Sequence, residues 1–176
     1  MSSDPADHEL RVPAGSLLIL IGASGSGKST FARTHFLTTE ILSADDCRAL
    51  VRDDPADQTA SADGFEVLRF IAGKRLRAGR STVVDATNVL EQERATLVTL
   101  ARTNGATAIA IVLDLPLETC LERNAERGTE SVPQRTVREQ VADLHEGFGR
   151  LRSEGFRDVY VLSSPHEVDA ASVVRL

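Results

Sequence analysis

Short apolar runs alternate with longer amphipathic stretches along this chain. The run at 16–21 is apolar at nearly every position, and the run at 106–113 is rich in Ile and Val. Runs of this kind predict buried strands, whereas apolar residues spaced by three and four, as at 64–77, predict helices. We expect strands at 16–21, 40–43, 81–85, 106–113 and 158–162, and helices at 28–37, 64–77, 91–103, 116–127 and 133–152.

The alternation of strands and helices predicts an α/β fold, a three-layer sandwich with a mostly parallel sheet. With 176 residues and 41% hydrophobic content the chain can bury one core, so residues 15–176 are expected to form a single domain. Residues 1–14 are predicted to be a flexible N-terminal segment, and the polar, Pro-containing stretch 52–63 a loop. In parallel sheets, ligands lie at the carboxyl ends of the strands, so the residues after each strand are candidates for function.

Directly after the first predicted strand, residues 22–29 match the phosphate-binding pattern G-x-x-x-x-G-K-[ST]. The glycines let backbone N–H groups curl around phosphates, and the next helix directs its positive end at the same anion. Lys28 is expected to contact the β- and γ-phosphates, and the Ser29 hydroxyl to coordinate Mg²⁺. The pattern predicts a nucleoside triphosphate site formed by Gly22, Ser24, Gly25, Ser26, Gly27, Lys28, Ser29 and Thr30.

Asp45 and Arg48 follow the second predicted strand at a spacing of three, so on a first helical turn they would face the same cleft. A carboxylate there can orient an acceptor hydroxyl and take its proton, and an arginine can neutralise charge in the transition state. The alternative is an aspartate that caps the helix and forms an exposed ion pair. The position beside the phosphate-binding loop favours the catalytic interpretation.

Asp85 ends the third predicted strand, directly after Val83 and Val84. An acid in this position resembles a Walker B carboxylate, which holds Mg²⁺ directly or through water. The alternative is again a helix cap. Thr87 and Asn88 come next and are expected to line the pocket for the phosphoryl acceptor.

Arginines cluster on both sides of a Gly- and Pro-containing connector within residues 120–140. Arg123 and Arg127 precede the connector, and Arg135 and Arg138 follow it. This arrangement predicts a mobile helical lid that excludes water and brings a guanidinium group to the γ-phosphate. The alternative, a helix hairpin with surface salt bridges, accounts for Arg138 but not for Arg123 or Arg127.

The formal net charge of −6 argues against a protein that coats long nucleic acids, because phosphate contacts need a broad positive field. Any nucleic acid is therefore expected to be bound locally, at an end or over a few nucleotides. The apolar runs are too short to cross a bilayer, the first residues lack the pattern of a signal peptide, and Cys47 and Cys120 form no paired motif. We expect a cytoplasmic protein with free thiols and no membrane partner.

An ordered set of motifs resembles the kinase module of bacterial polynucleotide kinase-phosphatase, a P-loop NTPase of the kinase-like group. The set comprises the loop 22–30, the pair Asp45 and Arg48, residues 83–88, and Glu122 with Arg123 and Asn124. The similarity extends over about residues 17–164. The D-D-x-R form of residues 45–48 is also similar to the phage polynucleotide 5′-kinase.

The resemblance implies transfer of the ATP γ-phosphate, with Mg²⁺, to a 5′-hydroxyl end of RNA or DNA during nucleic-acid end repair. It implies that Asp45 is the general base, that Arg48 contacts the 3′-phosphate of the acceptor, and that Arg123 contacts the ATP phosphates from the lid. Lys28 and Ser29 match the phosphate and metal ligands of the family.

Two features depart from the family pattern. Ala44 stands where the family carries a Ser before the aspartate, which would weaken an acceptor contact. The phosphatase and ligase-like modules do not occur in this sequence, so we expect repair partners to supply those activities.

Two other functions remain as alternatives. A P-loop kinase for a sugar, antibiotic or metabolite fits the acidic charge, and the D-A-T-N run at 85–88 also occurs in the similar 6-phosphofructo-2-kinase module. The second alternative is an ATP-gated binding subunit with little turnover, against which Asp45 and the predicted lid argue.

Overall fold

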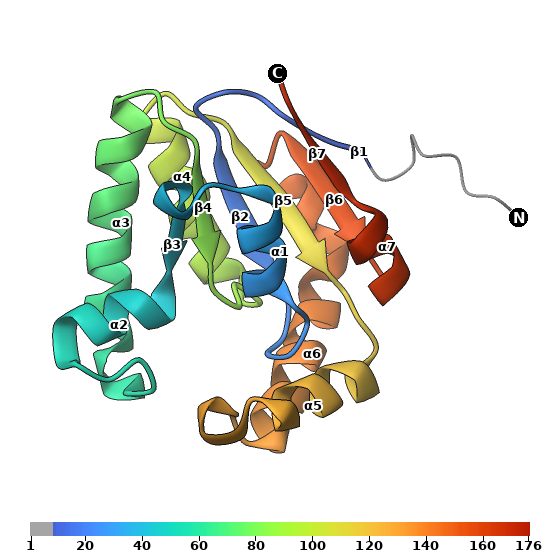
Figure 1. Cartoon of the computed structure of the whole chain (residues 1–176). Helices are drawn as coiled ribbons and strands as arrows, with labels where there is room; N and C mark the ends of the chain where they lie inside the picture. The colour runs from blue at the N-terminus through green and yellow to red at the C-terminus, as the bar shows by residue number, and fades with distance from the viewer. Residues whose placement is uncertain (1–8) are drawn as a thin grey trace, which may run out of the picture.

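The computed structural model describes residues 9–176, and its centre is a five-stranded sheet. The order of the strands is β3-β4-β2-β5-β6, and all neighbouring pairs are parallel (Figure 1). The predicted parallel sheet is therefore confirmed. The strands are β2 (Leu17–Ile21), β3 (Ile41–Ser43), β4 (Thr82–Asp85), β5 (Ala108–Leu113) and β6 (Asp158–Leu162).

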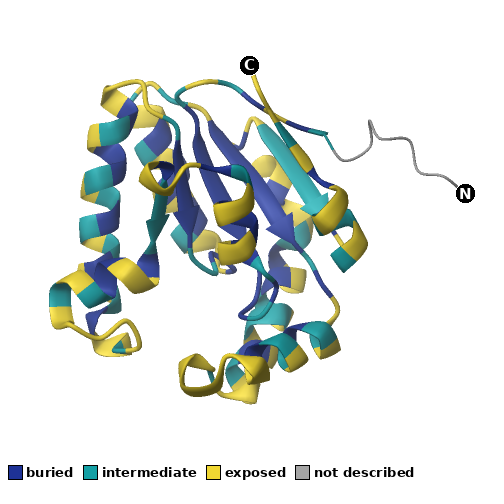
Figure 2. Ribbon diagram, viewed as in Figure 1, coloured by how far each residue is buried: buried dark blue, intermediate teal, exposed yellow. Residues whose placement is uncertain are grey.

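Helices cover both faces of this sheet and complete the predicted three layers. Leu17, Ile19 and Ile21 of β2 pack into one core, whereas Leu18 and Leu20 pack into the other. Because both faces are covered, β2 and β5 are buried along their whole length and have continuous apolar sequences (Figure 2). The first core includes residues of α3 (Ser61–Arg77), α4 (Glu91–Thr103) and α6 (Gln134–Gly147), and the second includes residues of α1 (Lys28–His35) and α7 (Pro165–Ala170).

The helices agree with the sequence prediction to different degrees. The bounds of α4 and β6 are those predicted. The predicted helix at 133–152 is too long, since α6 ends at Gly147 and the chain continues as the 3-10 helix η5 (Phe148–Ser153). Within residues 9–176, no helix combines the length and the apolar character that a membrane crossing requires.

The predicted loop at 52–63 contains more regular structure than expected. The helix α2 (Ala44–Arg52) ends at its start, the 3-10 helix η3 (Gln58–Ala60) lies within it, and α3 has already begun by residue 61. A local cap explains the difference, because the Asp57 carboxylate accepts a hydrogen bond from the backbone N–H of Thr59 at 2.9 Å. The capped turn leads directly into α3, so the polar composition of the stretch was misleading.

The first described residues form a strand rather than a flexible segment. The strand β1 (Glu9–Val12) pairs in parallel with β7 (Ser172–Arg175) in a separate two-stranded sheet, and both of its apolar side chains are buried. The prediction of a flexible segment at 1–14 is therefore wrong for β1, and residues 1–8 lie outside the described part of the chain. The partner strand β7 comes from the opposite end of the chain, so no local sequence pattern predicts the pairing.

The segment predicted as a lid consists of two helices around a short connector. The first is α5 (Leu117–Glu126), the connector includes the 3-10 helix η4 (Gly128–Glu130), and α6 follows. The buried Asn124 holds the connector, because its amide donates to the Val132 carbonyl at 2.8 Å and accepts from the Val132 N–H at 3.1 Å. In Figure 1, α5 and the neighbouring part of α6 lie beyond the carboxyl ends of the strands.

The backbone of the loop after β2 lies directly against α5. Gly25 has a φ of +83°, a conformation that side-chain-bearing residues rarely adopt. A Cβ at this position would clash with the carbonyl oxygen of Cys120 and lie 3.1 Å from the backbone nitrogen of Asn124. Only glycine therefore allows the loop to pack this closely on α5.

Gly25→Ala is expected to destabilise the protein far more than Gly128→Ala, although both residues have positive φ angles. A Cβ on Gly128 meets nothing within 4 Å, so that variant costs only the backbone strain of about 1–2 kcal/mol. Gly25→Ala adds overpacking, for a total of about 3 kcal/mol or more. Urea unfolding of the two variants measures the difference, and equal losses would contradict the close packing of the loop on α5.

Candidate active site

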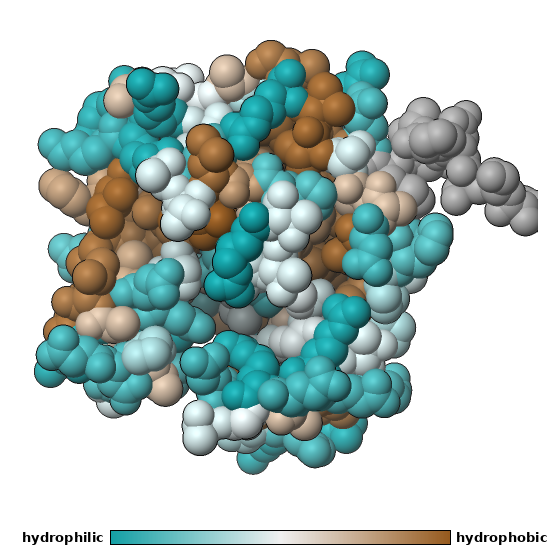
Figure 3. All heavy atoms as spheres, in the orientation of Figure 1, coloured by the Kyte–Doolittle hydropathy of each residue, from teal (hydrophilic) through white to brown (hydrophobic). Residues whose placement is uncertain are grey.

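Four segments bring polar side chains to one edge of the sheet. The phosphate-binding loop follows β2, α2 follows β3, Asp85 ends β4, and α5 follows β5. Because the strands are parallel, their carboxyl ends meet at the same edge, and the three predicted clusters come together there. This edge faces downward in Figure 1, and the surface around it is mainly hydrophilic in Figure 3.

Residues 22–29 make the expected turn from β2 into α1. Gly27 precedes the first residue of α1 and has a φ of +95°. The Gly22 N–H donates to the carbonyl of Thr87 at 2.9 Å, which ties the start of the loop to the segment after β4. The free N–H groups at the start of α1 and the positive end of the helix dipole therefore lie where a phosphate is expected to bind.

Lys28 is a buried cation at the start of α1. Its Nζ donates to the Ala23 carbonyl at 2.8 Å and lies 3.4 Å from the Ser26 hydroxyl oxygen. Burial lowers the pKa of Lys28 to about 8, although the negative charge of Asp85 acts in the opposite direction. An anion placed beside Lys28 would raise its pKa again, so the loop is electrostatically prepared for a phosphate.

Asp85 is buried at the end of β4, beside Ser29 and Lys28. Burial raises the pKa of the Asp85 carboxyl, and the negative charge of Asp45 raises it further. The nearby Ser29 hydroxyl and the positive charge of Lys28 oppose this rise in pKa. The four side chains therefore lie close enough to influence one another, although they come from three different segments.

The oxygen groups of Ser29 and Asp85 are the kind that Mg²⁺ prefers. Magnesium is normally held by one or two protein oxygens together with phosphates and water, and a Ser hydroxyl beside a carboxylate fits this pattern. In the described residues 9–176 no group of three or more His, Cys, Asp or Glu side chains is arranged for a metal. Metal binding by Ser29 and Asp85 stays a prediction.

Asp45 and Arg48 lie one turn apart at the start of α2 and form an ion pair. The helix cap is Ser43, whose hydroxyl accepts from the Asp46 N–H at 3.2 Å, so the alternative of an Asp45 cap is wrong. Arg48 is buried and its Nε donates to the carbonyl of Pro55 at 2.9 Å, whereas half of the Asp45 side chain is exposed. A fixed arginine thus positions an accessible carboxylate.

Two of the four arginines of the predicted lid lie near the phosphate-binding loop. A Cβ on Gly27 would lie 3.4 Å from Nη1 of Arg123. The positive charge of Arg127 contributes to the lowered pKa of the loop lysine. Arg135, in contrast, pairs with Glu139 at 2.7 Å on the exposed surface, as expected for an ordinary helical ion pair.

The structure changes the expected role of Asn88 and adds Gln140. Asn88 is fully buried and donates from Nδ2 to the carbonyl of Leu20 at 2.7 Å, so the prediction that it lines the acceptor pocket is wrong. Its φ of +47° suits Asn, which tolerates the left-handed conformation. Gln140 of α6 accepts from the Ser24 N–H at 2.8 Å, a contact that no local sequence signal reveals.

The fold and this site together define a P-loop kinase-like domain. Residues 17–151 match the model of a protein family described as AAA domain, and the chain belongs to that family. A search of curated proteins found no match.

Solved structures with the same fold include both RNA repair proteins and small-molecule kinases. A chain in the structure of the Pnkp1/Rnl/Hen1 RNA repair complex is 26% identical with a TM-score of 0.68, and the match covers 80% of this chain and 47% of that one. The present chain thus spans about half the length of that relative.

Two further structures share the fold at lower identity. A gluconokinase from Sinorhizobium meliloti 1021 is 18% identical with a TM-score of 0.54, and the match covers 90% of both chains. The APS kinase CysC from Mycobacterium tuberculosis, in complex with AMPPNP and APS, is 20% identical with a TM-score of 0.56, and the match covers 90% of this chain and 93% of that one. These structures support the kinase fold and leave the acceptor open.

The buried Lys28 predicts a pH dependence of stability. Its pKa is about 8 in the folded state and 10.5 in the unfolded state, so the unfolded chain binds more protons between these values and stability rises with pH there. The free energy of unfolding of the wild type, minus that of Lys28→Met, is expected to increase by about 3 kcal/mol from pH 8 to pH 10.5.

Urea unfolding at a series of pH values measures this difference. Below pH 8 the side chain is protonated in both states, so the difference between the two proteins stays constant. A difference that stays constant up to pH 10.5 would show that Lys28 is not buried as a strained cation.

Proposed function

We propose that this protein transfers the γ-phosphate of ATP to the 5′-hydroxyl end of RNA or DNA. The observation that carries the proposal is the ion pair of Asp45 and Arg48, placed at the carboxyl end of β3 beside the phosphate-binding loop. The similarity to a chain of an RNA repair complex, at 26% identity, supports this acceptor over others.

In this proposal the loop and the lid hold the donor. Lys28 and the N–H groups at the start of α1 bind the phosphates, while Ser29 and Asp85 hold Mg²⁺. Bound Mg²⁺ supplies positive charge that offsets the charge developing on the phosphate oxygens. Arg123 and Arg127 approach the transferred group from the lid side, where their charge stabilises the transition state.

Asp45 acts on the acceptor. Its carboxylate orients the 5′-hydroxyl and takes its proton as the new oxygen–phosphorus bond forms, while the bond to the β-phosphate oxygen breaks and ADP leaves. Arg48 holds Asp45 in place and contacts the phosphate on the 3′ side of the same nucleotide. The net charge of −6 fits a grip on the end of a strand rather than on its length.

Asp45→Asn is expected to reduce phosphoryl transfer by about a thousandfold or more, because the amide cannot take the proton. ATP binding, measured by calorimetry, should remain within a few-fold of the wild type. Transfer is measured with γ-labelled ATP, Mg²⁺ and a 5′-hydroxyl oligonucleotide. Asp46→Asn, which changes the next and exposed residue of α2, is the matched control and should retain full activity.

The same assay tests the acceptor with a panel of oligonucleotides, sugars and nucleosides. Label on the oligonucleotide supports the proposal. Label only on a small molecule would replace it with the small-molecule kinase alternative, and label on no acceptor would favour the ATP-gated binding subunit. Loss of ATP binding in Asp45→Asn would contradict the assignment of Asp45 as the base.

Arg48→Gln is expected to raise the KM for acceptors that carry a 3′-phosphate by about tenfold, the loss typical of a charged hydrogen bond. The KM for acceptors with a free 3′-hydroxyl should change much less, because they lack the group that Arg48 binds, whereas kcat should fall for both acceptor types, because Asp45 loses its partner. Steady-state kinetics with the two acceptor types measures the ratio. Arg52→Gln, at the exposed end of α2, is the control, and an equal rise in KM for both acceptors would contradict the 3′-phosphate contact.

A further inference from the structure

Arg94 is a fully buried charged side chain that lies outside the cluster described above. It belongs to α4, and its guanidinium donates from Nε and Nη2 to both carboxylate oxygens of Glu154, at 2.7 and 2.6 Å. Its Nη1 donates to the carbonyls of Asn88 and Val89, at 3.0 and 2.6 Å. One planar group thus satisfies a carboxylate and two backbone carbonyls at once, which lysine cannot do.

The two carbonyls belong to a segment that connects the candidate metal ligand with the phosphate-binding loop. Asp85 ends β4, and three residues later Asn88 takes a left-handed conformation and donates to the Leu20 carbonyl. Between them, Thr87 accepts the hydrogen bond from Gly22. The conformation of the segment 85–89 therefore determines how Asp85 is placed relative to the phosphate-binding loop.

The other side of Arg94 contacts the end of the lid helix. A Cβ on Gly147, the last residue of α6, would lie 3.1 Å from Nη2 of Arg94. Glu154 follows η5, which continues α6. Arg94 therefore lies between the segment that ends the lid and the segment that carries Asp85.

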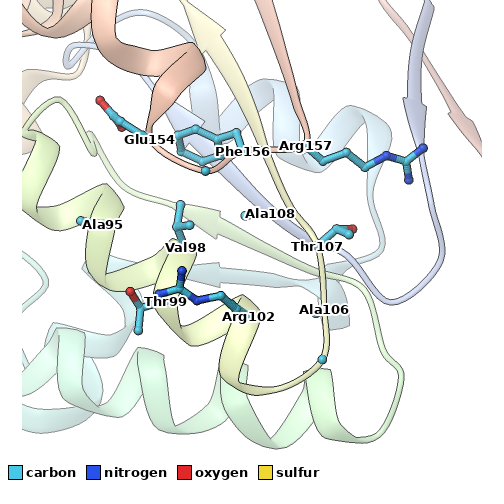
Figure 4. Close-up of a pocket in the computed structure, with 12 residues that line it drawn as sticks. Ala95, Val98, Thr99, Arg102, Ala106, Thr107, Ala108, Glu154, Phe156 and Arg157 are labelled. Atoms are coloured by element: carbon cyan, nitrogen blue, oxygen red, sulfur yellow. The ribbon is translucent and has the colours of Figure 1, made fainter.

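Among the nearby arginines, only Arg94 forms an ion pair with Glu154. A hollow of about 490 Å³ opens beside it, lined in part by Val98, Arg102, Phe156 and Arg157. Figure 4 shows that the side chains of Glu154 and Arg157 extend in opposite directions from this hollow. The side chains of Arg94 and Glu154 are only 1% and 5% exposed, so the pair is shielded from solvent although a hollow lies next to it.

Stability alone does not account for such a pair. The desolvation of two charges offsets most of their attraction, and apolar replacements of buried ion pairs are often as stable as the originals. A role in fixing the backbone accounts for the pair better, because the guanidinium donates hydrogen bonds to two carbonyls that belong to neither a helix nor a strand.

We infer that Arg94, held by Glu154, is a positioning residue for the candidate active site. It fixes residues 85–89 so that Asp85 faces Ser29 at the metal position. This inference rests on the proposed role of Asp85, and it concerns the geometry of the donor site rather than the identity of the acceptor.

The test replaces the pair by apolar residues in the full chain. The double variant Arg94→Met with Glu154→Leu leaves no unpaired buried charge, so it is expected to stay folded while the two carbonyls lose their donor. Its affinity for ADP without metal should stay within about twofold of the wild type, whereas the gain in affinity from Mg²⁺ should fall by about tenfold. Hydrogen exchange at residues 85–89 should become faster, because the segment is no longer held.

The matched control is Glu91→Leu with Arg150→Met. This exposed ion pair also starts from α4 and joins it at 2.8 Å to η5, the element that Glu154 follows, and its removal should change neither the Mg²⁺ effect nor the exchange. A folded Arg94–Glu154 double variant with the Mg²⁺ effect and the exchange of the wild type would overturn the inference. Should that variant fail to fold, Arg94→Lys replaces it, since lysine keeps the charge but loses the second carbonyl contact. The same two measurements on Arg94→Lys, the Mg²⁺ effect and the hydrogen exchange at residues 85–89, then decide the question.

Failure of the proposed function gives a different result. If the wild type labels only small molecules, the acceptor assignment falls, while nucleotide affinity with and without Mg²⁺ still tests the role of Arg94. If Mg²⁺ changes the ADP affinity of neither the wild type nor the Arg94–Glu154 double variant, Asp85 does not bind the metal, and the inference is overturned as well.

Discussion

The close packing of the phosphate-binding loop against α5 is the constraint on which the candidate site depends. Gly25 leaves no room for a side chain beneath the backbone of α5. Ser24 is held by Gln140 of α6, and Gly22 is held by Thr87 after β4. Three segments distant in sequence thus fix one short loop, and a loop fixed in this way needs little reorganisation when a phosphate binds. The helices α5 and α6 of the predicted lid therefore support the loop.

The charges around this loop form a second constraint. Lys28 is buried, and the nearby charges of Asp85, Arg127 and Asp45 all act on its pKa. Asp85 is in turn harder to ionise because it is buried. Removing one charge from such a group changes the protonation of the others, so single substitutions here affect more than one step of binding. The Arg94–Glu154 pair differs, because its charges are fully matched and its effect passes through the backbone.

The kinase fold is shared with proteins that act on different acceptors, so the fold alone does not choose among them. In this chain, α2 places the exposed carboxylate of Asp45 beside a buried arginine at the edge of the candidate donor site. The close approach of α3 at Gly64, where a Cβ would lie 3.0 Å from Cγ of Arg48, keeps that arginine in place. The proposed acceptor therefore depends on how α2 and α3 pack.

The sequence by itself determined the elements whose signals are local. The apolar runs of β2 and β5, the periodic α4, the phosphate-binding loop and the acidic residues after the strands could all be predicted, because neighbouring residues carry these patterns. Only the tertiary structure decided which distant groups meet: β1 pairs with β7, Gln140 holds Ser24, and Glu154 pairs with Arg94 sixty residues away. Asn88 shows the same limit, since its burial depends on β2 and not on its neighbours. Such contacts form when apolar faces pack together, and no local pattern records them.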